Sequence, residues 1–202
     1  SRIVPGRTSA INYEIVREPV GPAALFTPWN FPATSPARKI AAALAAGCTC
    51  VIKPSEETPA TALLIADALD RAGLPTGVLN VVFGQPARIS ERLLSNAVIR
   101  KVSLTGSTEV GRTLGILAAK HLKRATMELG GHAPVLVFAD SDIAEVARLA
   151  VAAKLRNAGQ VCIAPTRFLV ERRVQSDFID AMRAGMAAAI IGNGLDPATT
   201  LG

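Results

Sequence analysis

The amino-acid sequence predicts an α/β fold, in which a parallel sheet carries helices on both faces and is followed by the start of a second α/β domain. Short apolar segments with strand character alternate with helical segments along most of the 202 residues, a pattern typical of parallel sheets covered by helices. Half of the residues are hydrophobic and 19% are charged. This is the composition of an ordinary globular protein that is long enough to bury a sizeable core.

Each predicted strand is a short apolar run bounded by turn residues. The sequence places strands at 23–27, 50–53, 79–83, 101–104, 124–128, 135–138 and 167–170. Helices are expected at 36–46, 60–72, 87–95, 108–120, 143–155 and 174–189. Gly73, with Pro75 beyond it, ends the second helix, and Asp140, Ser141 and Asp142 supply a cap for the fifth. The alternation predicts a Rossmann-like sheet with helices on both faces.

The first 20 residues differ in character from the rest. Asn12–Arg17 alternate like an exposed strand, and such a strand usually finds its partner elsewhere. The sequence therefore predicts an exposed strand within residues 1–20.

The formal net charge of +6 raises the question of nucleic-acid binding. The basic residues are scattered, however, and one tryptophan, one tyrosine and six phenylalanines offer little surface for base stacking. The charge instead suits a small anionic partner. No apolar run approaches the roughly 18 residues needed to span a membrane, and three cysteines form no even-numbered disulfide framework. We expect a cytoplasmic protein that binds neither nucleic acid nor membrane.

Cys162 is the candidate nucleophile. It ends the segment RNAGQVC at 156–162, in which Gly159 permits a sharp turn and Asn157 and Gln160 suit a polar loop. A thiolate attacks carbonyl carbon well, whereas an isolated cysteine is more often an inert small hydrophobe. On these residues alone, both interpretations remain open.

Two polar residues follow or end predicted strands. Asn30 lies between Pro28 and Pro32, which hold the backbone out of a helix, so its amide could stabilise an oxyanion; the alternative is an ordinary turn asparagine. Glu128 ends a strand ahead of two glycines, where a partly desolvated carboxylate could act as a general base. A surface glutamate at a strand end is the alternative there.

Two further strand ends offer groups for a nucleotide. Lys53 is followed by Pro54, Ser55 and Glu56, and ligands of open α/β sheets bind at the carboxyl ends of strands. Lys53 could donate to ribose hydroxyls and Glu56 could accept from them, although a solvated lysine followed by a first-turn helix acid is the alternative. The segment GSTEVG at 106–111 opens a helix and could present backbone amides to a phosphate, or it could be a tight turn only.

The order and spacing of five segments resemble the aldehyde dehydrogenase superfamily. The segments are PWNFP at 28–32, KPSE at 53–56, LTGSTEVG at 104–111, MELGG at 127–131 and GQVC at 159–162. The resemblance runs from about residue 19 to the C-terminus and is strongest to the succinate-semialdehyde and 2-oxoglutarate-semialdehyde dehydrogenase type. It implies an internal fragment of a longer chain, with an oligomerisation arm at 1–20, a cofactor-binding domain at 21–130 and the N-terminal part of a catalytic domain at 131–202.

The resemblance also implies a role for each candidate residue. Cys162 is the nucleophile, Asn30 and the Cys162 backbone amide hold the oxyanion, and Glu128 activates the water that hydrolyses a thioester. The implied cofactor-binding residues are Trp29, Lys53, Pro54, Ser55, Glu56, Gly106, Ser107, Gly111 and Leu129. Because the carboxylate of Glu56 would repel a ribose 2′-phosphate, NAD is expected in preference to NADP.

Two arginines match positions at which semialdehyde dehydrogenases bind the distal carboxylate of their substrate. Arg156 precedes Cys162 by six residues and Arg38 follows Asn30 by eight, and a guanidinium group suits a carboxylate bidentately. Arg38 could equally be a solvated helix residue. We therefore expect an ω-carboxylated aldehyde as substrate, a homo-dimer or homo-tetramer for the complete enzyme, and little activity from this chain alone.

The remaining cysteines and histidines are not expected to carry chemistry. Ala164 stands where some succinate-semialdehyde dehydrogenases have a second cysteine, so a regulatory disulfide with Cys162 is not expected. Cys48 and Cys50 lack the partners of a metal site and are expected in the core. The two histidines, at positions 121 and 132, are expected on the surface or in loops.

Overall fold

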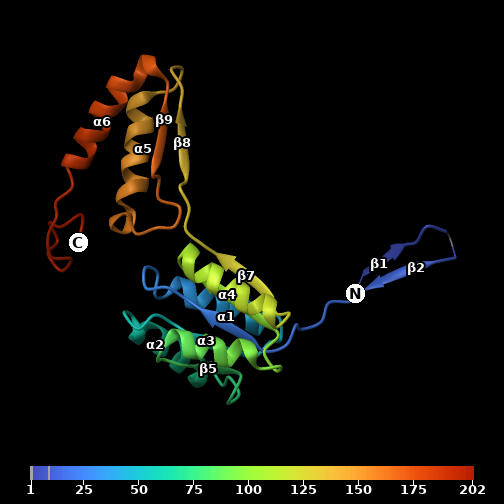
Figure 1. Cartoon of the computed structure of the whole chain (residues 1–202). Helices are drawn as coiled ribbons and strands as arrows, with labels where there is room; N and C mark the ends of the chain where they lie inside the picture. The colour runs from blue at the N-terminus through green and yellow to red at the C-terminus, as the bar shows by residue number, and fades with distance from the viewer. Residues whose placement is uncertain (1, 9) are drawn as a thin grey trace. The chain divides into compact units, whose positions relative to one another are not determined.

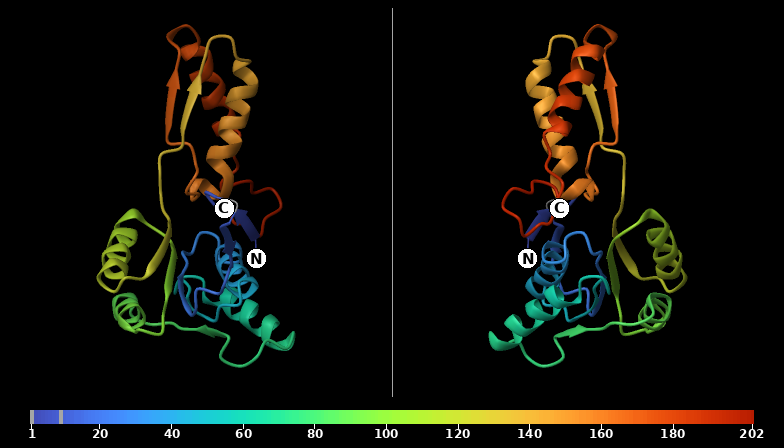
Figure 2. Two further views of the ribbon diagram at one scale, coloured as in Figure 1. Left: turned by 90° about the vertical axis from the view of Figure 1, so that its right-hand side faces the viewer. Right: turned by 90° about the vertical axis from the view of Figure 1, so that its left-hand side faces the viewer.

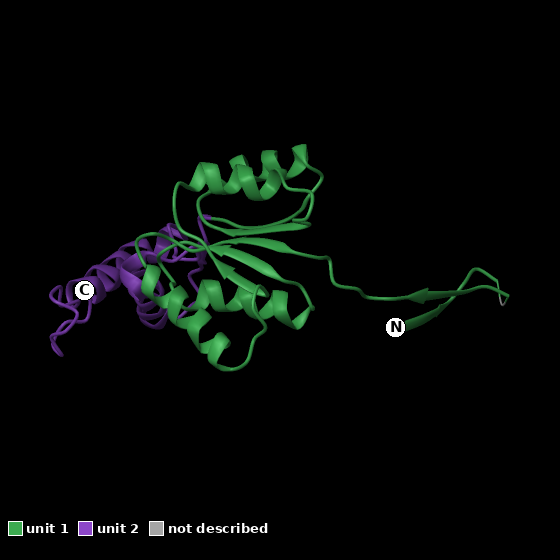
Figure 3. Ribbon diagram, turned by 90° about the horizontal axis from the view of Figure 1, so that it is seen from below, with its two compact units in different colours: residues 1–129 green, residues 130–202 purple. Residues whose placement is uncertain are grey.

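The computed structural model describes residues 2–8 and 10–202 and divides the chain into two compact units. The first comprises residues 1–129 and the second residues 130–202 (Figure 3). This division falls one residue before the domain boundary that the sequence predicts. The roles assigned to the two domains stay predictions.

A five-stranded parallel sheet forms the centre of the first unit. Its strands are ordered β5-β4-β3-β6-β7, so that β3, the first of the five in sequence, is the central one. Helices lie around this sheet in Figure 1. Their bounds are β3 Ala23–Phe26, β4 Cys50–Lys53, β5 Leu79–Val81, β6 Lys101–Thr105 and β7 Arg124–Glu128. The register pairs Ala23 with both Cys50 and Lys101. The predicted parallel sheet is thus confirmed.

Alternating residues of β3 send apolar side chains to opposite faces of this sheet. Ala23 and Leu25 lie in a core with α1 and α2, whereas Ala24 and Phe26 lie in a core with α3 and α4. Figure 3 shows helices on both sides of the sheet, as predicted. The helices are α1 Thr34–Ala45, α2 Pro59–Arg71, α3 Pro86–Ser95 and α4 Thr108–Lys120.

The N-terminal residues form a separate two-stranded antiparallel sheet of β1 Arg2–Pro5 and β2 Asn12–Ile15. The expectation that the strand beginning at Asn12 would find its partner elsewhere was wrong, because β1 pairs with it locally. Tyr13 and Ile15 remain about half exposed. Nothing in these contacts tests the predicted oligomerisation role.

In the second unit, a two-stranded parallel sheet packs against two helices (Figures 1 and 2). Its elements are β8 Pro134–Val137, α5 Ile143–Leu155, β9 Arg167–Val170 and α6 Gln175–Ala187. Two short 3-10 turns lie at Arg156–Gly159 and Arg172–Val174. The buried core contains Val137, Ala147, Phe178 and Met182.

Capping residues and glycines mark several of the helix ends that the sequence predicts. Asp142 caps α5, because its side chain accepts a hydrogen bond from the Glu145 amide at 3.1 Å. Gly73 follows α2 with a φ of 88°, and its amide donates to the carbonyl of Asp70. The predicted helix at 174–189 is shorter, since its first residue belongs to a 3-10 turn and it ends at Ala187. Among the described residues, no helix has the length and apolar character to cross a membrane.

Candidate active site

Predicted site residues lie at or just after the ends of four neighbouring strands. Lys53 is the last residue of β4 and Glu128 is the last residue of β7, while Asn30 follows β3 and Gly106 follows β6. Since parallel strands have their carboxyl ends at one edge, the fold brings these four segments to the same edge of the sheet. The strand order reverses next to β3, and this is where open α/β sheets bind ligands.

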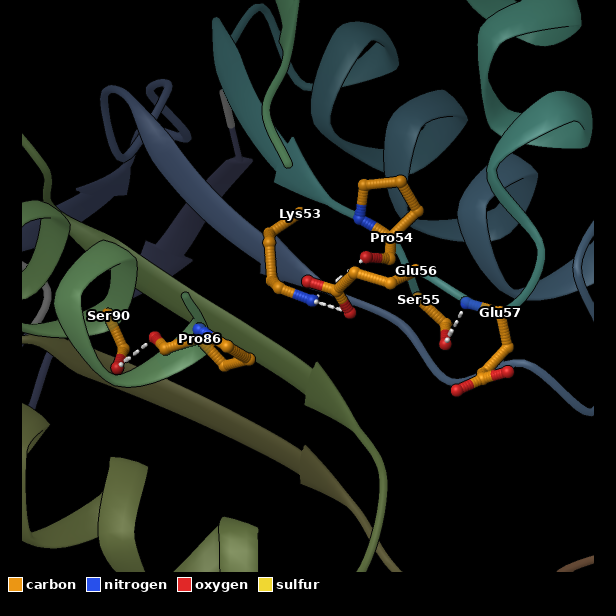
Figure 4. Close-up of polar contacts among 7 residues, drawn as sticks. All are labelled: Lys53, Pro54, Ser55, Glu56, Glu57, Pro86 and Ser90. Atoms are coloured by element: carbon orange, nitrogen blue, oxygen red, sulfur yellow. Dashed lines mark hydrogen bonds and ion pairs between the residues drawn. The ribbon is translucent and has the colours of Figure 1, made fainter. Parts of the chain in front are cut away.

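Lys53 is held at this edge by its own neighbours. The residue is 7% exposed, and its Nζ donates to the Pro54 carbonyl at 3.0 Å and to Glu56 Oε2 at 2.6 Å (Figure 4). An ammonium group has three protons, more than these two contacts use. Lys53 therefore has donor capacity left for a ligand oxygen.

The carboxylate of Glu56 stays ionised at neutral pH. Burial acts to raise its pKa, but hydrogen bonds from Lys53 and from its own and the Gly84 backbone bring the net pKa below the usual value. The side chain is 46% exposed, so its oxygens remain reachable from solvent. Together, Lys53 and Glu56 present a donor and an acceptor side by side, which suits the hydroxyl pair of a ribose.

The amino end of α4 lies beside the ends of β6 and β7. Ser107 caps this helix by accepting a hydrogen bond from the Val110 amide at 3.3 Å, and the Gly106 amide donates to the Glu128 carbonyl at 3.0 Å. The positive end of the helix dipole favours an anion here. The segment therefore fits the phosphates of a dinucleotide.

Gly111, predicted as a cofactor residue, has a packing role in the structure. It is buried in α4, and a Cβ added there would lie 2.5 Å from Cδ2 of Leu129 and 2.9 Å from its Cδ1. Glycine thus lets Leu129, the residue that follows β7, pack directly on the helix. A side chain at position 111 would therefore displace Leu129, the residue that the resemblance assigns to the cofactor.

The segment after β3 presents both polar and aromatic groups. Trp29 is 46% exposed and Asn30 is half-buried. Thr27, just before them, is 6% exposed, and its hydroxyl has no hydrogen-bond partner within the described part of the chain. An unsatisfied buried hydroxyl costs about 1–3 kcal/mol, which is unusual outside functional sites.

Glu128 differs from expectation, because it is exposed rather than partly desolvated. A half-buried cation, Lys39, interacts electrostatically with it, and the sequence alone did not single this residue out. Lys39 Nζ donates to Ser103 Oγ at 2.7 Å. Burial lowers the pKa of Lys39 to about 8; the charge of Glu128 opposes this shift and that of Lys101 adds to it. An ammonium group that titrates near pH 8 thus interacts electrostatically with the predicted general base.

The position of Lys39 in the sequence indicates that it lies next to the buried face of α1. It lies three residues after Pro36 and directly before Ile40, both of which are buried on α1. Positions three and four apart share one face of a helix, so Lys39 borders the apolar stripe. The neighbouring Arg38 is exposed, as one of its two interpretations expects.

Cys162 lies in an exposed loop of the second unit, as predicted. Three successive residues before it, Asn157, Ala158 and Gly159, have φ values of 49°, 53° and 77°. Two non-glycine residues in this left-handed region indicate local strain, which tends to concentrate at functional sites. After the cysteine, the Ala164 amide donates to the Val161 carbonyl at 2.9 Å and closes a turn around it.

The predicted site residues are divided between the two units. Asn30, Arg38 and Glu128 belong to residues 1–129, whereas Arg156 and Cys162 belong to residues 130–202. Arg156 is exposed at the beginning of the 3-10 turn that precedes the cysteine. That these five side chains meet at one substrate is part of the proposal below.

The other candidate ligands behave largely as predicted. Cys48 and Cys50 are buried, and burial, with a smaller contribution from Cys48, raises the pKa of the Cys50 thiol to about 11. No cluster of three metal-ligating side chains occurs among residues 2–8 and 10–202. His121 lies in the turn that follows α4, in keeping with the loop prediction, although it is half-buried and its Nε2 is enclosed without a partner in the described structure.

Known proteins match both the sequence and the fold. A model described as the aldehyde dehydrogenase family matches residues 2–202. The 4-(hydroxymethyl)benzenesulfonate dehydrogenase of Comamonas testosteroni is 49% identical over 201 residues, which cover 100% of this chain and 42% of that protein. The succinate-semialdehyde dehydrogenase (NADP(+)) of Escherichia coli K12 is 43% identical over 199 residues, or 98% of this chain and 41% of that protein.

Solved structures agree with the sequence relatives. The crystal structure of succinate-semialdehyde dehydrogenase from Burkholderia pseudomallei superposes with a TM-score of 0.95 at 44% identity, and covers 99% of this chain and 42% of that one. The chain thus spans about two fifths of the length of these relatives. Sequence and fold agree over nearly all of its residues, and the chain belongs to the aldehyde dehydrogenase family.

Proposed function

We propose that this chain supplies the cofactor site and the nucleophile of an NAD-preferring aldehyde dehydrogenase, whose substrate carries a second, anionic group. The observation that supports this most strongly is the gathering of four predicted site segments at the carboxyl ends of β4, β3, β6 and β7. The family membership makes aldehyde oxidation the activity that this edge best fits.

In the proposed reaction, the Cys162 thiolate forms a C–S bond to the aldehyde carbon. The side-chain amide of Asn30 and the Cys162 backbone amide donate to the resulting oxyanion, and a well-placed donor of this kind is worth about 3 kcal/mol in the transition state. A nicotinamide dinucleotide, when bound, supplies the acceptor for the hydride that leaves this carbon.

The second half of the reaction releases the acid. Glu128 takes a proton from water, the hydroxide attacks the thioester carbonyl, and the C–S bond breaks to return the thiolate. The sum is one aldehyde and one water converted to a carboxylic acid, with two electrons and one proton leaving as hydride and the second proton passing from Glu128 to solvent. The charge of Glu128 in turn favours the ammonium form of Lys39.

The cofactor preference rests on Glu56. Its ionised carboxylate lies beside Lys53, where it would accept from ribose hydroxyls and repel a 2′-phosphate. The Escherichia coli relative is named for NADP(+), so members of the family differ in this preference. We therefore expect NAD to bind more tightly than NADP. Glu56→Gln should reduce the ratio of the two affinities.

The substrate class follows from the two arginines and from the relatives. Arg38 and Arg156 are exposed cations of the kind that binds a carboxylate or sulfonate bidentately. One relative is named for succinate semialdehyde and another for a benzenesulfonate, and both of those compounds carry an anionic group. We propose that the arginines bind such a group, with succinate, glutarate and 2-oxoglutarate semialdehydes as the leading candidates.

The test compares succinate semialdehyde with butanal in the complete enzyme that carries this chain, at saturating NAD. A charge-assisted contact worth about 1.5–3 kcal/mol predicts a kcat/KM ratio of roughly 10–150 in favour of the semialdehyde. Arg156→Met should reduce this ratio, while Arg183→Met, on the exposed face of α6, should not. A ratio near one would indicate a general aldehyde dehydrogenase instead.

Two variants separate the chemical steps. Cys162→Ser should abolish reduction of NAD, whereas Glu128→Gln should retain one fast turnover and then stall at the thioester. Binding of NAD with no burst from the unchanged enzyme would favour a dinucleotide-binding protein without catalysis. The 202-residue chain alone should bind NAD but turn over little substrate.

A further inference from the structure

Two residues outside the predicted site are joined by three hydrogen bonds. The Thr166 hydroxyl donates to the His132 carbonyl at 2.6 Å and the Thr166 amide donates to the same carbonyl at 3.1 Å. The ring Nδ1 of His132 lies 3.1 Å from Thr166 Oγ1. We refer to this set of contacts as the His132–Thr166 clasp.

The single proton of the Thr166 hydroxyl decides which atom donates in the contact between the hydroxyl and Nδ1 of His132. A hydroxyl has one proton, and the Thr166 proton goes to the carbonyl of His132 at the shorter distance. The hydroxyl oxygen must therefore accept, so Nδ1 of His132 carries a proton. This donor is present both in the Nδ1–H tautomer and in the imidazolium form, and the clasp does not depend on which of the two is populated.

The clasp closes the loop that carries Cys162. Thr166 follows the cysteine by four residues and directly precedes β9, whose first residue pairs with Pro134 of β8. Between the cysteine and the clasp, Ala164 is 4% exposed and its amide closes the turn on Val161. The loop is thus fixed to the two-stranded sheet on its C-terminal side.

The other partner of the clasp lies close in sequence to the predicted general base. His132 follows Glu128 by four residues, with Gly130 and Gly131 between them. Four residues of extended chain span at most about 14 Å. Cys162 and Glu128 are therefore each separated from the clasp by only four residues, and the two glycines allow the chain to turn between Glu128 and His132.

We propose that Thr166, with His132, is a positioning residue that fixes the loop bearing Cys162 to the segment that leads into β8. This role requires no contact between either residue and the substrate. The clasp acts by holding the backbone of the cysteine turn, whose amide at Cys162 is a donor to the oxyanion in the reaction proposed above. A displacement of about 1 Å at such a donor can reduce turnover by roughly 100-fold. This inference rests on the proposed function only for its effect on catalysis.

The test begins with hydrogen exchange on the 202-residue chain, which needs no enzyme activity. Thr166→Val removes the hydroxyl but keeps the backbone amide, and should accelerate exchange of the amides at 164 and 166 at least tenfold, with α5 and α6 unchanged. Thr166→Ser should stay within twofold of the unchanged chain. Thr113→Val, which removes an exposed hydroxyl that also donates to a carbonyl, is the matched control.

Turnover in the complete enzyme supplies the second measurement. Thr166→Val should lower kcat about tenfold with KM for NAD unchanged, and Thr166→Ser should restore kcat. Equal acceleration of exchange in the loop and in α5 and α6 would show a general stabilising role and overturn the proposal. Faster loop exchange with unchanged kcat would overturn it as well. If the chain lacks dehydrogenase activity altogether, exchange still reports on the clasp.

Discussion

Replacement of Gly111 by alanine tests how α4 packs against the segment that follows β7. The same substitution at Gly115 is a matched control on the same helix, because a Cβ added at Gly115 meets nothing within 4 Å. Alanine is favoured over glycine in helices by up to about 1 kcal/mol at either position. The difference between the two variants therefore isolates the contact with Leu129.

The structure sets the expected size of that difference. At Gly111 the new methyl would lie 2.5 and 2.9 Å from the two Cδ atoms of Leu129, about 1 Å inside ordinary contact distance. Overpacking costs about 1–3 kcal/mol, and the low end applies here because the clashing atoms are the free end of the half-buried Leu129 side chain, which can shift. The free energy of unfolding of Gly111→Ala should thus be about 1 kcal/mol below that of Gly115→Ala.

Urea unfolding followed by the fluorescence of Trp29 would measure this, since Trp29 is the single tryptophan of the chain and lies in the same unit. Gly115→Ala should be as stable as the unchanged chain or more so. Equal stability of the two variants would refute the inferred contact and return Gly111 to a direct cofactor role. Weaker NAD binding by Gly111→Ala would show that Leu129 transmits the change.

Two further predictions concern charge. Glu56→Gln should lower stability at pH 7 by about 1 kcal/mol, the upper range for exposed ion pairs, because its partner Lys53 is buried; Glu57→Gln is the control. Folding lowers the pKa of Glu56. Its contribution to stability is therefore present above pH 4.5, the usual pKa, and is lost as pH falls through the pKa of the folded chain. A stability difference between Glu56→Gln and the unchanged chain that is as large at pH 3 as at pH 7 would contradict this. The pKa of Lys39 falls from 10.5 to about 8 on folding. Between pH 8 and pH 10.5, Lys39 is therefore protonated in the unfolded chain and largely deprotonated in the folded one. Stability should therefore rise with pH across that window by more than in Lys39→Met, whereas the exposed control Lys120→Met should follow the unchanged chain.

The elements that the sequence predicted most closely have locally encoded ends. The predicted bounds of β4, β7, β9, α4 and α5 agree with the structure, because apolar periodicity and turn or capping residues such as Asp142 act within a few positions. Where such signals are absent, the predicted and observed ends of a segment differ. The helix expected from residue 36 begins at Thr34, where no side chain caps it.

The site residues divide in the same way. Lys53 and Gly106 could be named in advance because Lys53 ends a strand and Gly106 directly follows one, and Glu56 lies three residues after Lys53 at the same edge of the sheet. Lys39 was missed because its significance depends on Ser103, 64 residues away in sequence. The role of Gly111 likewise depends on Leu129.

By itself, the sequence determined the alternation of strands and helices, the family and the residues that can carry the chemistry, because residue types and their spacing along the chain encode these properties. Only the tertiary structure decided which cation lies near Glu128, which strand pairs with β2 and which residues hold the Cys162 loop. The first and last of these contacts join positions far apart in sequence, whereas β1 and β2 are neighbours along the chain. The energies of these contacts depend on burial and on distances of a few ångströms, which a linear pattern does not contain.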